Sequence, residues 1–86
     1  MMAKLTELRK SVSDIDDEIY ELFTKRMGLV EQISDIKTTL DLPIEDINLE
    51  ETKLSLYEDE AFKNVLRTIM LVSKLFQHSE RALYGN

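Results

Sequence analysis

The stretch LTELRKSVSDIDDEIYELFTKRMGLVEQISDIKTTL, residues 5–40, decides the fold of this chain. Its apolar residues recur at alternating intervals of three and four, which is the spacing of a helix that packs lengthwise against other helices. The pattern therefore predicts one long helix over residues 5–40. The apolar seam of this helix consists of Leu5, Leu8, Val12, Ile15, Ile19, Leu22, Leu29, Ile33, Ile36 and Leu40.

Two further helices are predicted after the long one. Asp41, Leu42 and Pro43 should end the long helix, because proline has no N–H to donate and pushes the preceding residue out of helical geometry. Asp46 or Asn48 is expected to cap a short helix running to about Tyr57. The acidic cluster at 58–60 marks a turn or the opening of a third helix, since negative charge suits a helix N-terminus. A buried stripe is predicted on that helix at Phe62, Val65, Ile69, Val72, Phe76 and Leu83.

The sequence thus predicts an all-α fold with one long, one short and one medium helix in a single domain, residues 1–86, of which Gly85 and Asn86 should fray. A helix over residues 5–40 would be about 54 Å long, well beyond the diameter of a globule of this size. Its seam would protrude, and a second chain would have to cover it. We therefore expect an intertwined or antiparallel homodimer.

Composition argues against several classes of partner. Seventeen acidic against eleven basic residues give a net charge of −6, which disfavours nucleic acid and anionic lipid. The longest apolar run, 69–72, is far shorter than a membrane span requires. There is no cysteine, and the single histidine, His78, reads as a surface residue. We expect no metal site and a cytoplasmic location.

Arg26 occupies a seam position where an aliphatic residue is expected. An unpaired buried guanidinium costs several kcal/mol, so something must neutralise it. A salt bridge or a snorkelling side chain would do so, and so would a bound anion. Lys37 lies eleven residues further on, within about 20° of Arg26 on the helix surface and roughly 16 Å along it. The gap between the two charged groups would suit a small dianion.

Three other polar residues are candidates for the same site. Arg9 lies about 100° round the helix from Arg26, so it is either an exposed arginine or, in an antiparallel dimer, a residue of the partner's pocket. Ser73 and Gln77 are four residues apart on one face of the third helix and interrupt an apolar neighbourhood. This pair is either a polar contact at the edge of the core or part of a ligand site.

Three segments together resemble the all-helical class of chorismate mutase. They are LRKSVSDIDDEIYELFTKRMGLVEQISDIK (8–37), LPIEDINLEE (42–51) and SKLFQ (73–77), and they occur in the expected order over nearly the whole chain. The resemblance implies a three-helix domain whose two interlocked chains form two active sites. It also implies the Claisen rearrangement of chorismate to prephenate, in phenylalanine and tyrosine biosynthesis, without a cofactor.

The resemblance further implies roles for seven residues. Arg26 and the partner's Arg9 would bind the two carboxylates, with assistance from Ser73. Lys37 and Gln77 would donate to the ether oxygen. Glu50 would accept from the ring hydroxyl, and the backbone around Asp46 would close that side of the pocket.

One departure from the family pattern lies in the second helix. Family members usually carry arginine immediately before the glutamate matched by Glu50, whereas this chain has Leu49. The connection between the second and third helices is also shorter than usual. Besides chorismate mutase activity, three readings therefore stay open: action on an amino analogue of chorismate, an isochorismate pyruvate lyase, and a non-catalytic or partner-dependent dimerisation or regulatory module.

Overall fold

Three helices make up the fold of residues 1–84, the part of the chain that the computed structural model describes. They are α1 (Met2–Thr39), α2 (Ile47–Leu54) and α3 (Glu60–Tyr84), and no strand occurs among the described residues. The prediction of one long, one short and one medium helix is confirmed. Gly85 and Asn86, which we expected to fray, lie outside the described residues.

The end of α1, at Thr39, is set by backbone hydrogen bonds in the residues that follow it. Asp41 adopts a left-handed conformation, with φ of 54°. The N–H of Leu42 donates to the carbonyl of Lys37 at 2.8 Å, and the N–H of Asp41 donates to that of Thr38 at 3.2 Å. This pair of hydrogen bonds is a Schellman motif, which satisfies the last carbonyls of a helix. The stop thus lies at Asp41 and Leu42, two of the three residues predicted to end the helix, and Pro43 follows them.

An aspartate side chain caps the N-terminus of each of the other two helices. The Asp46 carboxylate accepts from the N–H of Leu49 at 3.0 Å at the start of α2. At the start of α3, the Asp59 carboxylate accepts from the N–H groups of Ala61 and Phe62. Both caps confirm the predicted starts. The predicted end of the second helix near Tyr57 was wrong, because the chain leaves α2 at Leu54 and makes only turn-type hydrogen bonds up to Tyr57.

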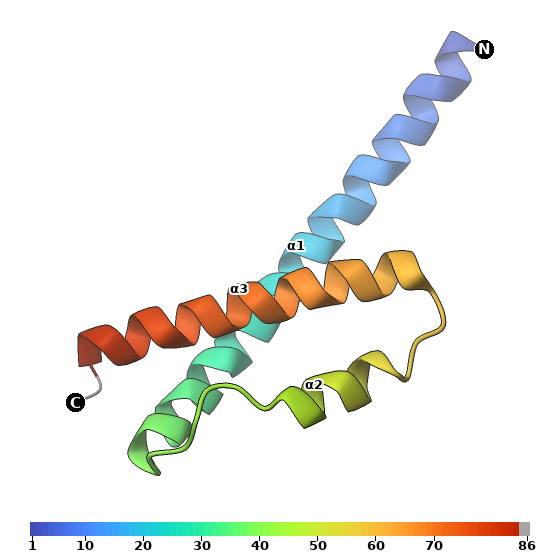
Figure 1. The fold of residues 1–86 in the computed structure, drawn as a ribbon. Helices are drawn as coiled ribbons and strands as arrows, with labels where there is room; N and C mark the ends of the chain where they lie inside the picture. Colours follow the sequence, from blue (N-terminus) through green and yellow to red (C-terminus); the bar gives the residue numbers. More distant parts are fainter. Residues whose placement is uncertain (85–86) are drawn as a thin grey trace.

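The second half of α1 crosses α3, and α2 packs against α3 beside that crossing (Figure 1). The interior at the crossing is small and half polar. Its buried residues are the apolar Val30, Ile44 and Leu66 and the polar Ser34, Ser73 and Gln77. The small core is therefore as much polar as apolar in its buried residues.

The first half of α1 stands apart from the other helices (Figure 1), and every residue from 1 to 22 is exposed. The radius of gyration is 17.1 Å, against about 12 Å for a globule of this length. All ten residues of the apolar seam are exposed, and so are Phe62, Val65, Val72 and Leu83 of the predicted α3 stripe. The exposed seam agrees with the expectation that it protrudes from a single chain. The burial predicted for Phe62, Val65, Val72 and Leu83 does not occur within residues 1–84, because the described chain folds no second layer over them.

Candidate functional site

A cavity of about 290 Å³ lies between α1, the segment leading into α2, α2 itself and α3. Six of the seven predicted site residues line it: Arg26, Lys37, Asp46, Glu50, Ser73 and Gln77. The seventh, Arg9, lies in the exposed first half of α1, about 25 Å of helix rise before Arg26. Apolar side chains of Val30, Ile33, Ile44, Leu49 and Met70 complete most of the wall. The size suits a small organic molecule.

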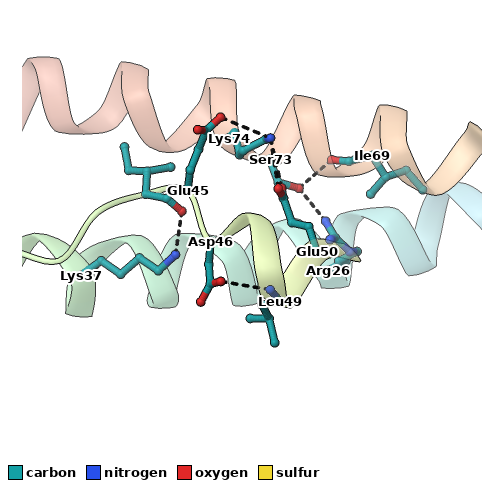
Figure 2. A network of polar contacts seen from close by, with 10 residues as sticks. Arg26, Lys37, Glu45, Asp46, Leu49, Glu50, Ile69, Ser73 and Lys74 are labelled. Atoms are coloured by element: carbon teal, nitrogen blue, oxygen red, sulfur yellow. Dashed lines mark hydrogen bonds and ion pairs between the residues drawn. The ribbon is translucent and has the colours of Figure 1, made fainter. Parts of the chain in front are cut away.

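Arg26 projects from the crossing of α1 with α3 and is half-buried. Its guanidinium donates to the Ser73 hydroxyl, and that hydroxyl donates in turn to the carbonyl of Ile69 at 2.8 Å (Figure 2). No carboxylate pairs with Arg26 within the described part of the chain. The salt-bridge explanation for this residue is therefore wrong there, and most of its donors remain available to an anion.

Lys37 lies further along the same side of α1 and is also half-buried. Its ammonium donates to the carbonyl of Ile44 at 2.8 Å (Figure 2). This bond ties the segment before α2 to α1 and fixes the direction of the lysine side chain. A neutral carbonyl does not compensate the positive charge, and among residues 1–84 no second acceptor is found for the other N–H donors of Lys37.

The α2 wall presents a carboxylate that is already paired. Lys74 of α3 lies 3.1 Å from Glu50 Oε1 and 3.4 Å from Glu45 Oε1 (Figure 2). The hydrogen bond to Glu50 is the main cause of a raised pKa of Lys74, against the opposing effect of desolvation. Lys74 therefore stays charged. Our sequence reasoning missed this residue although it lies within SKLFQ, because its partners are distant in sequence and only the packing of α2 on α3 joins them.

Gln77 provides a neutral amide on the α3 side of the cavity. It is 6% exposed, and its Oε1 has no hydrogen-bond partner among the described residues. A buried, unsatisfied amide oxygen is costly, which favours a polar ligand or water at this position. Ser73 and Gln77 therefore lie in the core and also line the cavity, so that a role in a ligand site stays a prediction.

The cavity combines positive charge, neutral donors and apolar walls. Arg26 and Lys37 carry charges that no carboxylate cancels within residues 1–84, and Ser73 and Gln77 add neutral groups. In chemical terms, such groups can bind a small dianion and can stabilise further negative charge developing on it. Among the described residues, no group of three or more His, Cys, Asp or Glu side chains is placed to hold a metal ion.

An open apolar groove adjoins this cavity. Its volume is about 760 Å³, and it is lined mainly by Ile19, Leu22 and Phe23 of α1 and by Phe62, Val65 and Ile69 of α3. Arg26 lines both the groove and the cavity.

None of the helices in the described residues is long and apolar enough to cross a membrane.

Comparison with known proteins identifies the family. Residues 8–78 match the family model described as chorismate mutase type II. A chorismate mutase of Methanocaldococcus jannaschii is 39% identical over 46 residues, which are 54% of this chain and 46% of the relative. A bifunctional chorismate mutase/prephenate dehydratase of Aquifex aeolicus is 44% identical over 43 residues, which are 50% of this chain and 12% of the relative.

The matched stretch spans about half the length of the first relative and a smaller share of the second. No solved structure gave a significant match. The family model, in contrast, covers most of the chain, including the segments that form the cavity from Arg26 to Gln77. This chain belongs to the chorismate mutase type II family.

Proposed function

We propose that this chain catalyses the rearrangement of chorismate to prephenate, in sites shared between two chains of a homodimer. The observation that carries the proposal is the cavity in which Arg26 and Lys37, both without a carboxylate partner in the described chain, face Ser73 and Gln77. Chorismate is a small dicarboxylate with an ether oxygen. Its two negative charges match the two cations, and its size matches the cavity.

The reaction is unimolecular and needs no proton or electron from the protein. One C–O bond of the ether breaks while one C–C bond forms, and negative charge develops on the ether oxygen. The site has two tasks: to hold the substrate in its compact reactive conformation and to stabilise that charge. We assign the first task to Arg26, assisted by Ser73, through a carboxylate. We assign the second to Lys37 and Gln77, which retain N–H donors for an oxygen.

Two groups on the α2 side fit the remaining polar atoms of the substrate. Glu50 lines the cavity and would accept a hydrogen bond from the ring hydroxyl. The Asp46 carboxylate is occupied by capping Leu49, so its contribution would come from the backbone around it. The apolar wall would exclude water from the reacting bonds, which strengthens the electrostatic contribution of the cations.

The homodimer is supported by the exposed seam and by the groove beside the cavity. The seam presents ten apolar residues along α1, and the groove is lined mainly by apolar side chains of both α1 and α3. A second copy carries the same seam and is the partner whose shape and chemistry match it. Because Arg26 lines both the groove and the cavity, a helix in the groove would end close to the substrate. We propose that Arg9 reaches the site in this way.

Loss of chorismate with appearance of prephenate tests the activity. The purified wild-type chain should convert chorismate, and Arg26→Ala and Lys37→Ala should each lower kcat/KM about 10²- to 10³-fold, because each removes charge stabilisation in a shielded site. Equal inactivity of wild type and both variants would reject the proposal. Pyruvate release from isochorismate without prephenate formation would instead establish a lyase.

Mixing two inactive variants tests the shared site. Arg9→Ala and Lys37→Ala chains should each form inactive homodimers. After subunit exchange, half of the dimers would be mixed, and each mixed dimer would hold one intact site. The mixture should therefore recover about a quarter of wild-type activity. No recovery despite proven exchange would place Arg9 and Lys37 in the same chain's site, and full activity of the Arg9→Ala homodimer would remove Arg9 from the site. We also propose a cytoplasmic location for this biosynthetic activity, which cell fractionation would check.

A further inference from the structure

Lys74 is a cation of the cavity wall whose role differs from those of Arg26 and Lys37. Its ammonium lies between two carboxylates, 3.1 Å from Glu50 Oε1 and 3.4 Å from Glu45 Oε1 (Figure 2). The side chains of Lys74 and Glu50 are each 23% exposed. The contact joins α3 to α2 and to the segment before it, so it is held on both sides.

Among the neighbouring residues of the cavity wall, Lys74 is the cation that pairs with Glu50. Leu49, the residue before Glu50, is apolar and lines the same cavity. Lys53 also lines the cavity, but its ammonium lies 5.3 Å from the centre of the Tyr57 ring. Within the described chain, the ion pairs of Glu50 are made with Lys74 alone.

This pairing matters because Glu50 faces the space where a dianion would bind. An uncompensated carboxylate in a half-buried wall would repel the substrate, and it would be free to turn away from the hydroxyl it should accept from. The ammonium of Lys74 removes both problems. Arg26 and Lys37, bonded to a hydroxyl and a carbonyl, keep their charges for the ligand.

We infer that Lys74 is a positioning residue of this site, whose ammonium orients the Glu50 carboxylate and cancels its charge toward the dianionic substrate. The inference rests on the proposed function and extends it, because it assigns the charge on the α2 wall to a residue of α3. Lys74 acts through Glu50, and contact between Lys74 and the substrate is not part of its role.

A double-mutant cycle on substrate binding and turnover tests this inference. The variants are Lys74→Met, Glu50→Gln and the double variant, with chorismate affinity measured by calorimetry and with KM and kcat measured separately. Lys74→Met should raise KM about tenfold, since it leaves a half-buried carboxylate unpaired. In the Glu50→Gln background the same change should alter KM less than about twofold, because no charge remains to be cancelled.

Two further variants separate positioning from a general effect on stability. Lys74→Arg keeps the charge at the same position and should restore KM to within about threefold of wild type. Lys63→Met removes a lysine of α3 whose ion pair with Glu60, at 3.5 Å, lies outside the cavity, and it should leave KM unchanged. Circular dichroism and thermal melting would check that every variant is folded.

The outcomes distinguish this inference from the proposed function. A wild-type KM in folded Lys74→Met, or an equal loss in both backgrounds, would overturn the inference while leaving the mutase activity intact. If Lys74→Met does not fold, an elevated KM in Lys74→Arg would overturn the inference and a near-wild-type value would support it. A wild-type chain that neither binds nor converts chorismate would overturn both proposals.

Discussion

The two halves of α1 carry the same apolar repeat but have different surroundings. Every residue of the first half, up to Leu22, is exposed, and that half stands apart from the other helices (Figure 1). The second half crosses α3 and contributes Val30 and Ser34 to the buried interior and Arg26 and Lys37 to the cavity. The apolar repeat therefore does not tell which residues the chain itself buries: in the second half the buried residues are Val30 and Ser34, which lie beside the repeat, and the repeat residues of both halves stay exposed within one chain.

The largest effect is expected from a substitution that weakens dimerisation through the exposed first half of α1. Ile15→Asp should weaken dimerisation about 10³-fold and abolish activity in parallel, because an unpaired carboxylate in an apolar interface costs several kcal/mol. Sedimentation at several protein concentrations, with the mutase assay on the same samples, measures both effects. Thr24→Asp adds the same charge on the opposite side of α1, about 180° away, and should have little effect. A wild-type chain that sediments as a monomer at micromolar concentration would contradict the shared-site proposal.

A smaller effect, on kcat/KM, is expected from a substitution in the cavity beside the second half of α1. Leu49→Arg should raise kcat/KM up to about tenfold, because it adds a cation to a wall that faces a dianion. Leu49 is exposed enough to accept the longer side chain. Leu56→Arg makes the same change outside the cavity and serves as the control. Unchanged or lower kcat/KM in Leu49→Arg would show that the missing arginine does not limit this chain.

Substitutions at Asp41, which ends the second half of α1, should change the free energy of unfolding. Asp41→Gly should raise the free energy of unfolding by roughly 0.5 kcal/mol, because glycine adopts the left-handed conformation without the steric cost of a side chain. Asp41→Ala should lower it, since alanine lacks the local hydrogen-bonding group that helps aspartate tolerate this conformation. Urea unfolding at one fixed protein concentration measures both changes. A loss of stability in Asp41→Gly would contradict the role assigned to the Schellman motif.

The smallest effect concerns the acidic contact between Glu80 of α3 and the second half of α1. A hydrogen bond with Asp35, then desolvation and the charges of Asp35 and Glu31, raise the pKa of Glu80, and Ser34 opposes the shift. The folded state thus holds this proton more tightly than the unfolded state. Its contribution to stability is present below the ordinary pKa of 4.5 and is lost as pH rises through the raised value.

Glu80→Gln should therefore be slightly more stable than wild type at neutral pH, and the difference should shrink as the solution is acidified. Thermal melting of both proteins from neutral to acidic pH measures the difference in stability. Glu58→Gln, an exposed carboxylate in the turn before α3, provides the control for a general loss of negative charge. A constant difference at all pH values would rule out titration of Glu80 as the cause.

Much of the site could be predicted from the sequence because its residues interrupt regular patterns. Arg26 breaks the seam, Lys37 lies at a helical interval from it, and Ser73 and Gln77 share one face of α3. The match of residues 8–78 to the family confirms the resemblance that assigned roles to these positions. Lys74 was missed because no periodic pattern connects it to Glu50 and Glu45, which lie in other elements.

The helices and the polar positions within their apolar stripes could be predicted from the sequence, because these depend on spacing along the chain and on contacts within a few residues. For the cap of the second helix, the sequence left Asp46 and Asn48 as alternatives, and the structure shows Asp46. Only the tertiary structure decided which face of each helix its own chain covers. It placed Ser34, Ser73 and Gln77 in the interior and left the leucines and isoleucines of the seam outside. The physical reason is that burial depends on the path of the whole chain: three helices of such unequal length can cover only the crossing of α1 with α3.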